Sequence, residues 1–276
     1  MTQLKPLFDF YINSSIHVAL AVLAMTYVTL LELNLPTDWS LLLFIFFSSI
    51  TGYNFVKYFG LAKFHHRHLA TWLKVIQVFS LACFLLMLWF ALQLRLQTLL
   101  FIAVFAIVTF LYAIPFLPSH LFMDQQKNLR NIGGLKVYVI ALVWAGVTVL
   151  LPVLNNNLGF SLDVWIMAGQ RFILVMLLML PFEIRDLQYD SLKLATIPQK
   201  IGVKNTKIMG LLMGILFLML EFLKDEYSYK LILMTMAVTL TILLFIAFSN
   251  KNRSDYYSSF WVESVPILWL VLHLIF

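Results

Sequence analysis

Three carboxylates in the second half of the chain have the spacing of a small chemical site. Glu183, Asp186 and Asp190 stand at positions i, i+3 and i+7, so on a helix they share one face. Crowded carboxylates repel one another unless a hard cation or basic groups lie among them, and Mg²⁺ on one or two carboxylates often binds substrate phosphates. The alternative interpretation is a solvated helix end, at which Arg185 and Lys193 neutralise the acids.

A second polar segment carries the opposite charge. Residues 51–74 contain no Asp or Glu, but they include Asn54, Lys57, Tyr58 and Lys63. A histidine-rich run follows, consisting of His65, His66, Arg67 and His68. Imidazoles bind borderline metals, but adjacent residues of a helix point in different directions, so we interpret these histidines as headgroup-facing side chains. The basic segment as a whole suits an anionic ligand such as a lipid phosphate.

Membrane helices must position these two segments. Hydrophobic residues make up 62% of the 276 residues and charged residues 12%, which is about half the charged fraction of a soluble domain. Each membrane crossing needs about 20 mostly apolar residues in a helix, because hydrocarbon satisfies no backbone polar group. About nine segments fit this requirement. They are Ile16–Leu33, Trp39–Val56, Val75–Leu92, Thr98–Phe116, Val137–Leu154, Val164–Phe182, Ile208–Leu223, Leu231–Phe248 and Phe260–Phe276. We therefore predict an all-α polytopic membrane protein with a single domain, residues 1–276.

The basic residues orient the predicted helices. With the N-terminus on side one, 15 of the 19 Lys and Arg residues fall in segments on that side, which the positive-inside rule makes cytoplasmic. An odd number of crossings then places the C-terminus on the opposite side. We expect an integral protein of a bacterial inner membrane. The net charge of +6 follows from the same bias and does not indicate a nucleic-acid partner, because no soluble basic domain presents it.

The acidic segment and its surroundings resemble a known family. Residues 183–190 read E-x-x-D-x-x-x-D and are followed by Thr-Ile-Pro at 196–198 and Ile-Gly at 201–202. This pattern resembles the second aspartate-rich motif of the UbiA-type intramembrane prenyltransferases. Tyr112, in the segment 111–116, is similar to the tyrosine of that family's Tyr-Ser-x-Pro segment, and a basic stretch follows at 127–136.

The resemblance implies a bundle of about nine helices around a central cavity. In that family a cytoplasmic site binds a prenyl diphosphate through Mg²⁺, an apolar cavity holds the isoprenoid tail, and the prenyl group is joined to a lipophilic acceptor. Carried over to this chain, Asp186 and Asp190 are the expected catalytic residues, and both are expected to bind metal together with Glu183. The expected substrate-binding residues are Asn54, Lys57, Tyr58, Lys63, Tyr112, Arg185 and Lys193.

This chain departs from the first aspartate-rich motif of that family. The family reads N-x-x-x-D-x-x-x-D, whereas this chain has Asn54 followed by Tyr58 and Ala62. Positive charge in this segment disfavours Mg²⁺. Three hypotheses stay open. In the first, the protein is a transferase in which Lys57 and Lys63 contact the phosphate while Asp186 and Asp190 hold one ion. In the second, it is a catalytically silent lipid-binding or partner protein in which Lys57 pairs with the acidic segment, and in the third, the basic segment binds another anionic ligand, such as a lipid phosphate.

One further carboxylate falls inside a predicted span. Glu263 lies about two helical turns beyond Asp255, where a lone charge in hydrocarbon is costly. We predict that Glu263 faces the bundle and not the lipid.

Overall fold

A computed structural model describes residues 4–58, 71–113, 134–188, 196–225 and 228–276. Within these ranges the chain is helical and has no strand. Lys63, Asp190, Lys193 and the histidines at 65, 66 and 68 lie outside the described residues. Tyr112 lies in a described helix, but its side chain is not described.

The helices follow the predicted spans closely. Their bounds are α1 Leu4–Asn13, α2 Ile16–Glu32, α3 Trp39–Tyr58, α4 Thr71–Ala91, α5 Leu96–Ala113, α6 Leu135–Ala145, η4 Gly146–Leu150, α7 Leu151–Asn155, α8 Leu162–Asp186, α9 Ile197–Met219, η6 Leu220–Leu223, α10 Tyr229–Phe248, η7 Tyr257–Val262 and α11 Val265–Ile275. Among the described residues, seven helices are long and apolar enough to cross a membrane, or eight if the bent pair α1 and α2 counts as one span, and a shorter apolar helix covers Leu96–Leu111. Each predicted span overlaps one of these segments, so the predicted all-α polytopic architecture is confirmed.

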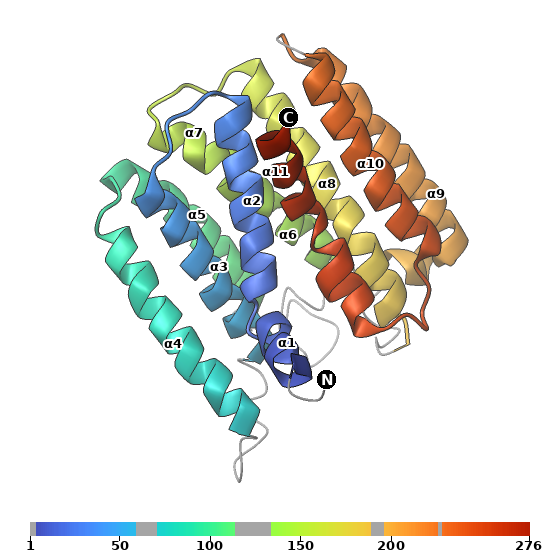
Figure 1. Cartoon of the computed structure of the whole chain (residues 1–276), viewed down its shortest axis with the longest axis horizontal. Coiled ribbons are helices and arrows are strands. Elements are labelled where there is room, and N and C mark those ends of the chain that lie inside the picture. Colours follow the sequence, from blue (N-terminus) through green and yellow to red (C-terminus); the bar gives the residue numbers. More distant parts are fainter. Residues whose placement is uncertain (1–3, 59–70, 114–133, 189–195, 226–227) are drawn as a thin grey trace, which may run out of the picture.

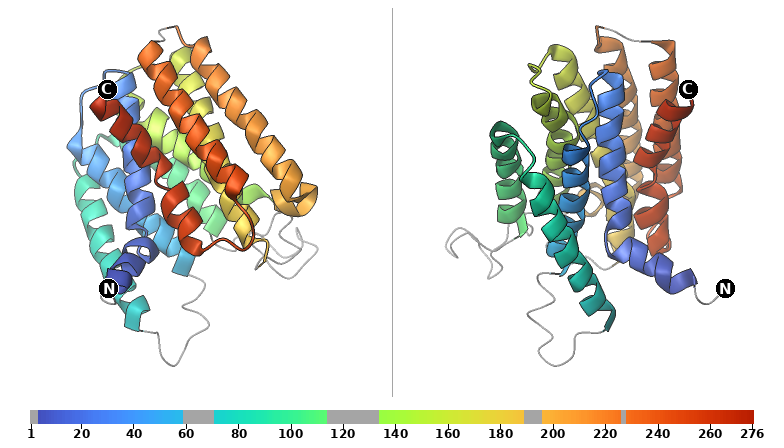
Figure 2. Two further views of the ribbon diagram at one scale, coloured as in Figure 1. Left: turned by 45° about the vertical axis from the view of Figure 1, so that its right-hand side comes forward. Right: turned by 60° about the vertical axis from the view of Figure 1, so that its left-hand side comes forward.

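The helices form a bundle, and the two termini of the chain lie at opposite ends of it (Figure 1). α8 is central: 67% of the residues in its apolar window are buried, against 17% for α4. α3, α4 and α5 form one flank and α9 and α10 the other, with α2, α6, α8 and α11 between them (Figures 1 and 2). The apolar core is built mainly from α2, α3, α6, α8, α10 and α11. α4 and the outer faces of α5, α9 and α10 therefore present their apolar side chains to lipid.

The chain breaks between α1, which precedes the first predicted span, and α2, which forms it. Ser15 adopts a left-handed conformation with φ of 65°, which costs a residue with a side chain roughly 1–2 kcal/mol. α1 and α2 bend by 56° at this point. α1 consequently lies across the end of the bundle and does not extend α2 (Figure 2).

The span Leu135–Asn155 contains a turn of π-helix, η4, that begins at Gly146. The ring of Phe105 in α5 packs directly on Gly146, so that a Cβ atom at this position would overlap the ring. Absence of a side chain at Gly146 is what lets α5 approach the wider turn. Gly169 in α8, by contrast, has open space where its Cβ would be.

We predict that Gly146→Ala lowers the free energy of unfolding by about 1–3 kcal/mol, because overpacking forces Phe105 out of its position. Gly169→Ala is the matched control and leaves stability unchanged or raises it by up to about 1 kcal/mol through helix propensity. Unfolding of the detergent-solubilised variants, followed by circular dichroism, measures both. Equal stability of the two variants contradicts the close approach of Phe105 to Gly146.

Candidate functional site

Three segments meet at the end of the bundle that carries the N-terminus. Lys57 comes from the last turn of α3, Arg185 from the last turn of α8, and Glu263 directly follows η7. The charges of Lys57 and Arg185 both act on the Glu263 carboxylate. Since these cations belong to α3 and α8 and the Glu263 side chain is partly buried, the structure is consistent with the prediction that Glu263 faces the bundle. We call Lys57, Arg185 and Glu263 the end site.

A histidine of α2 holds η7 in place. His17 Nδ1 lies 2.7 Å from the Tyr11 hydroxyl oxygen, and His17 Nε2 lies 3.0 Å from the Phe260 carbonyl oxygen. Since a carbonyl oxygen only accepts hydrogen bonds, Nε2 is the protonated nitrogen and Nδ1 accepts from Tyr11. Single π-helical turns such as η7 are frequent at functional sites. The contact from His17 fixes the turn that delivers Glu263.

Asn54, a predicted substrate-binding residue, holds the bend between α1 and α2. Its side chain is 3% exposed. Its Oδ1 accepts from the Ser15 hydroxyl at 2.8 Å, while its Nδ2 donates to the Ser14 carbonyl at 2.9 Å and the Ser80 hydroxyl at 2.7 Å. Lys57 Nζ donates to the Ser15 hydroxyl at 2.9 Å. The Asn54 amide is therefore fully engaged in hydrogen bonds within the protein. The neighbouring Lys57 side chain is exposed at the surface.

Tyr58, which stands where the resembling family has an aspartate, also contacts α1. Its hydroxyl donates to the Asn13 carbonyl at 2.8 Å, and its ring meets the edge of Trp72 with centroids 6.1 Å apart. An aromatic residue here joins the ends of α1, α3 and α4. Contact of Tyr58 or Tyr112 with substrate stays a prediction.

The first acid of the E-x-x-D segment caps a helix. Glu183 is buried, and its Oε2 accepts from the backbone N–H of Ile197 at 3.1 Å, the first residue of α9. Thr196 and Gln199 complete a capping box at the same helix start. Further on, Gly202 has φ of 77°, a conformation that favours glycine. The Thr-Ile-Pro and Ile-Gly residues of the motif therefore shape the start of α9 beneath the end of α8.

Asp186 is engaged by its neighbour Arg185. Asp186 Oδ1 accepts from Arg185 Nε at 2.8 Å and lies 2.7 Å from Arg185 Nη2. Arg185 Nη1 lies 3.8 Å from Asp255 Oδ1 in the segment before η7, and the guanidinium lies over the Phe182 ring at 5.3 Å. Arg185 therefore links α8 to the segment that carries Glu263, and it forms ion pairs with two carboxylates, those of Asp186 and Asp255.

The described residues do not supply a complete Mg²⁺ site. Among them, no group of three or more His, Cys, Asp or Glu side chains is placed to hold a metal ion. Glu183 caps α9, Asp186 binds Arg185, and Lys57 on the facing wall repels a cation. The roles predicted for Asp186 and Asp190 in catalysis, and for Glu183, Asp186 and Asp190 in metal binding, stay predictions.

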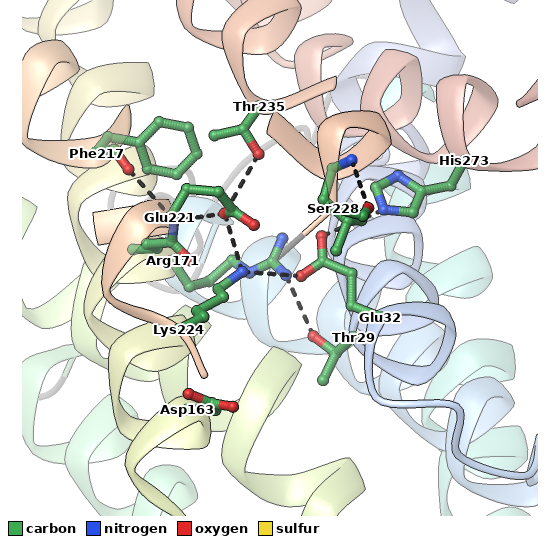
Figure 3. Close-up of polar contacts among 12 residues, drawn as sticks. Thr29, Glu32, Asp163, Arg171, Phe217, Glu221, Lys224, Ser228, Thr235 and His273 are labelled. Carbon is green, nitrogen blue, oxygen red and sulfur yellow. Dashed lines mark hydrogen bonds and ion pairs between the residues drawn. The ribbon is translucent and has the colours of Figure 1, made fainter. Parts of the chain in front are cut away.

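A buried ionic cluster lies at the opposite end of the bundle (Figure 3). Lys224 Nζ lies 3.0 Å from Glu221 Oε2 and 3.4 Å from Glu32 Oε2, and His273 Nε2 lies 3.2 Å from Glu32 Oε1. Arg171, only 1% exposed, lies in the same cluster. The members come from α2, α8, η6 with its following residue, and α11.

The contacts of Arg171 are mixed in kind. Its Nη2 donates to the Thr29 hydroxyl at 3.2 Å, its guanidinium lies over the Trp269 ring at 4.6 Å, and the charge of Glu32 acts on it. The neighbouring Gln170 donates to Glu221 Oε2 at 2.9 Å. In the sequence, Arg171 is one of the four basic residues that fall outside the cytoplasmic segments. An ionisable residue inside an apolar span is the signal that points to such a cluster.

Comparison with known proteins places this arrangement in a recognised fold. No protein-family model matches the sequence, and no curated protein matches it either. A solved structure of digeranylgeranylglyceryl phosphate synthase in membranes is similar over 100% of this chain and 98% of that one, with a TM-score of 0.59 and 14% identity. The structure of a UbiA homologue from Archaeoglobus fulgidus is similar over 97% of this chain and 98% of that one, with a TM-score of 0.57 and 12% identity. The chain is therefore an integral membrane protein with the UbiA-type fold.

We predict that Arg171→Met lowers the free energy of unfolding by about 3–5 kcal/mol, because it removes one of the two buried Lys and Arg cations that balance Glu32 and Glu221 and leaves the buried cluster with excess negative charge. Lys230→Met, at an exposed position at the start of α10, is the control and changes stability by less than about 0.5 kcal/mol. Adding Glu32→Gln to Arg171→Met costs less than the sum of the single changes, because the two groups are coupled. Additive effects in the double variant contradict an electrostatic pairing of Arg171 with Glu32.

Proposed function

We propose that the protein is a membrane-embedded transferase that acts on an isoprenoid diphosphate or a polyprenyl lipid and joins the prenyl group to a lipophilic acceptor. One observation carries this proposal: on a UbiA-type fold, Lys57 in the last turn of α3 and Arg185 in the last turn of α8 place two cations at one end of an apolar bundle, within electrostatic reach of Glu263. A cationic end above an apolar interior matches a ligand with an anionic head and a long hydrocarbon tail.

The proposed reaction begins with cleavage of the bond between the allylic carbon and the diphosphate oxygen. The electron pair leaves with the diphosphate, whose growing negative charge is stabilised by the cations of Lys57 and Arg185. Arginine binds phosphate oxygens with two parallel hydrogen bonds, whereas lysine acts as a point charge. The acceptor then attacks the allylic carbocation and loses a proton, which completes the transfer.

The remaining residues that the sequence predicts for substrate or metal complete this proposal. Lys63 adds a cation from the basic segment, and Lys193 with Asp190 follows Asp186 on the acidic segment. Tyr112, Tyr58 and Asn54 border the substrate. Mg²⁺ on Asp186 and Asp190 is retained as a prediction, and no step is assigned to it because Asp186 and Glu183 are engaged by Arg185 and α9.

A second candidate function is a catalytically silent protein that binds an isoprenoid or anionic lipid, or serves as a membrane partner subunit. The observation that favours it is the commitment of the motif side chains to the protein's own structure: Glu183 to α9, Asp186 to Arg185. In this candidate the same fold binds the lipid, and the carbon–oxygen bond stays intact.

We predict that the purified protein transfers a radiolabelled prenyl group from a diphosphate series to a component of a membrane lipid extract. Lys57→Met lowers the rate by about 100-fold or more, since it removes a cation that stabilises the charge developing on the diphosphate. Asp186→Asn also lowers the rate, because Asp186 positions the Arg185 guanidinium. Lys230→Met, at the far end of α10, is the control and leaves the rate unchanged. Parallel reactions with and without Mg²⁺ test the metal.

The assay separates the two candidates. Binding of the diphosphate without product, under every metal condition, supports the silent lipid-binding protein and rejects the transferase. Neither binding nor product rejects both.

We also propose that the end site faces the cytoplasm, as the excess of basic residues on that side indicates. In a Cys83→Ala background, we predict that Lys251→Cys in the loop after α10 is labelled by an impermeant maleimide only in inverted vesicles. Tyr229→Cys at the other end of α10, where Tyr229 is 89% exposed, is labelled only in right-side-out vesicles. The reverse pattern contradicts the proposed orientation.

A further inference from the structure

An apolar groove runs along the outer flank of the bundle between α10 and η7. It has a volume of about 400 Å³ and is lined by Thr241, Leu244, Phe245, Phe248, Arg253 and Tyr257. Leu244 and Phe248 are 58% and 60% exposed, so this part of α10 faces the lipid. The groove is thus an open trough for a hydrocarbon chain, and Arg253 is its charged lining residue.

Arg253 has donors to spare at the mouth of the groove. Its Nε donates to the Phe248 carbonyl at 3.1 Å, and its guanidinium lies over the Tyr257 ring at 5.1 Å. Tyr257 is itself fixed, because its hydroxyl donates to the Phe245 carbonyl at 2.7 Å. Among the contacts of the described residues, neither terminal nitrogen of the exposed Arg253 donates a hydrogen bond.

A second cation lies at the same helix end. Lys207 Nζ in α9 donates to the Ala247 carbonyl at 2.7 Å, next to the Phe248 carbonyl that Arg253 contacts. The nearby Asp255 carboxylate lies 3.8 Å from Arg185 Nη1, so it has a cationic partner of its own. Capping of the last carbonyls of α10 accounts for Lys207 Nζ and Arg253 Nε. It does not account for the free Arg253 nitrogens above an apolar trough.

We propose that this groove binds an anionic phospholipid. One acyl chain lies along Leu244 and Phe248, and the headgroup phosphate is bound by the terminal nitrogens of Arg253 with Lys207 beside it. The charge complementarity selects this occupant, because a neutral isoprenoid or a zwitterionic lipid gains less from two cations at one helix end. This end of α10 lies on the side of the bundle with the excess of basic residues, which is the side expected to face the leaflet rich in anionic lipid. This site is separate from the end site and does not depend on the proposed transferase activity.

The test is native mass spectrometry of the full-length protein released from micelles that contain phosphatidylglycerol or phosphatidylcholine. The wild-type protein is expected to retain phosphatidylglycerol in preference to phosphatidylcholine. Arg253→Gln weakens phosphatidylglycerol binding by about tenfold, the effect of losing a charge-assisted hydrogen bond. Lys230→Gln, which removes a cation from the opposite end of α10, does not change it.

A second variant tests the groove without removing the hydrogen bond from Arg253 to the end of α10. Leu244→Trp fills the groove without altering a charge and also weakens lipid retention, whereas Leu233→Trp, on another exposed part of α10, does not. Equal retention by wild type and both Arg253→Gln and Leu244→Trp overturns the proposal. Equal retention of the two lipids, or displacement of the lipid by millimolar inorganic phosphate, overturns it as well.

Discussion

A charged side chain inside a membrane bundle is tolerated only where an opposite charge or a hydrogen-bonding group meets it. The buried cluster around Arg171 meets this requirement by drawing groups from several helices to one place. Glu32 ends α2, Lys224 follows η6, and His273 lies in the last turn of α11. None of these helices can slide along its axis without separating a buried charge from its partner, which is strongly unfavourable. The cluster therefore fixes the relative heights of the helices.

The end site inherits its geometry from that constraint. α8 carries Arg171 in the cluster and Arg185 in the end site, separated along the helix axis by roughly 21 Å. The segment of η7 and α11 likewise carries Glu263 near one end and His273 near the other. Two stiff elements that are tied together at the cluster thus bring Arg185 and Glu263 to matching heights. The fine adjustment comes from His17, which holds the Phe260 carbonyl at the turn before Glu263.

The sequence predicts the spans well because an apolar run of sufficient length is a local property. It also predicts that Glu263 faces inward, because one carboxylate in a span needs a partner. It does not predict the bend at Ser15, since that conformation depends on Asn54, which lies far along the chain. The cluster escapes prediction for the same reason: Lys224 and Glu32 are 192 residues apart in sequence. Glu183 has the spacing of a metal ligand, yet the start of α9 gives it a different partner.

The bend at Ser15 has a consequence for how the protein responds to an anion. Lys57 Nζ donates a hydrogen bond to the Ser15 hydroxyl and so helps to hold the Ser15 backbone in its left-handed conformation. An anion that attracts Lys57 competes with that hydroxyl, and the Ser15 side chain then keeps its hydrogen bond to Asn54 alone. The strain of the turn is less well balanced in that state, so α1 is released more readily from the end of the bundle. Anion binding at the end site therefore increases amide hydrogen exchange in α1, because both depend on the hydrogen bonds that Lys57 Nζ donates.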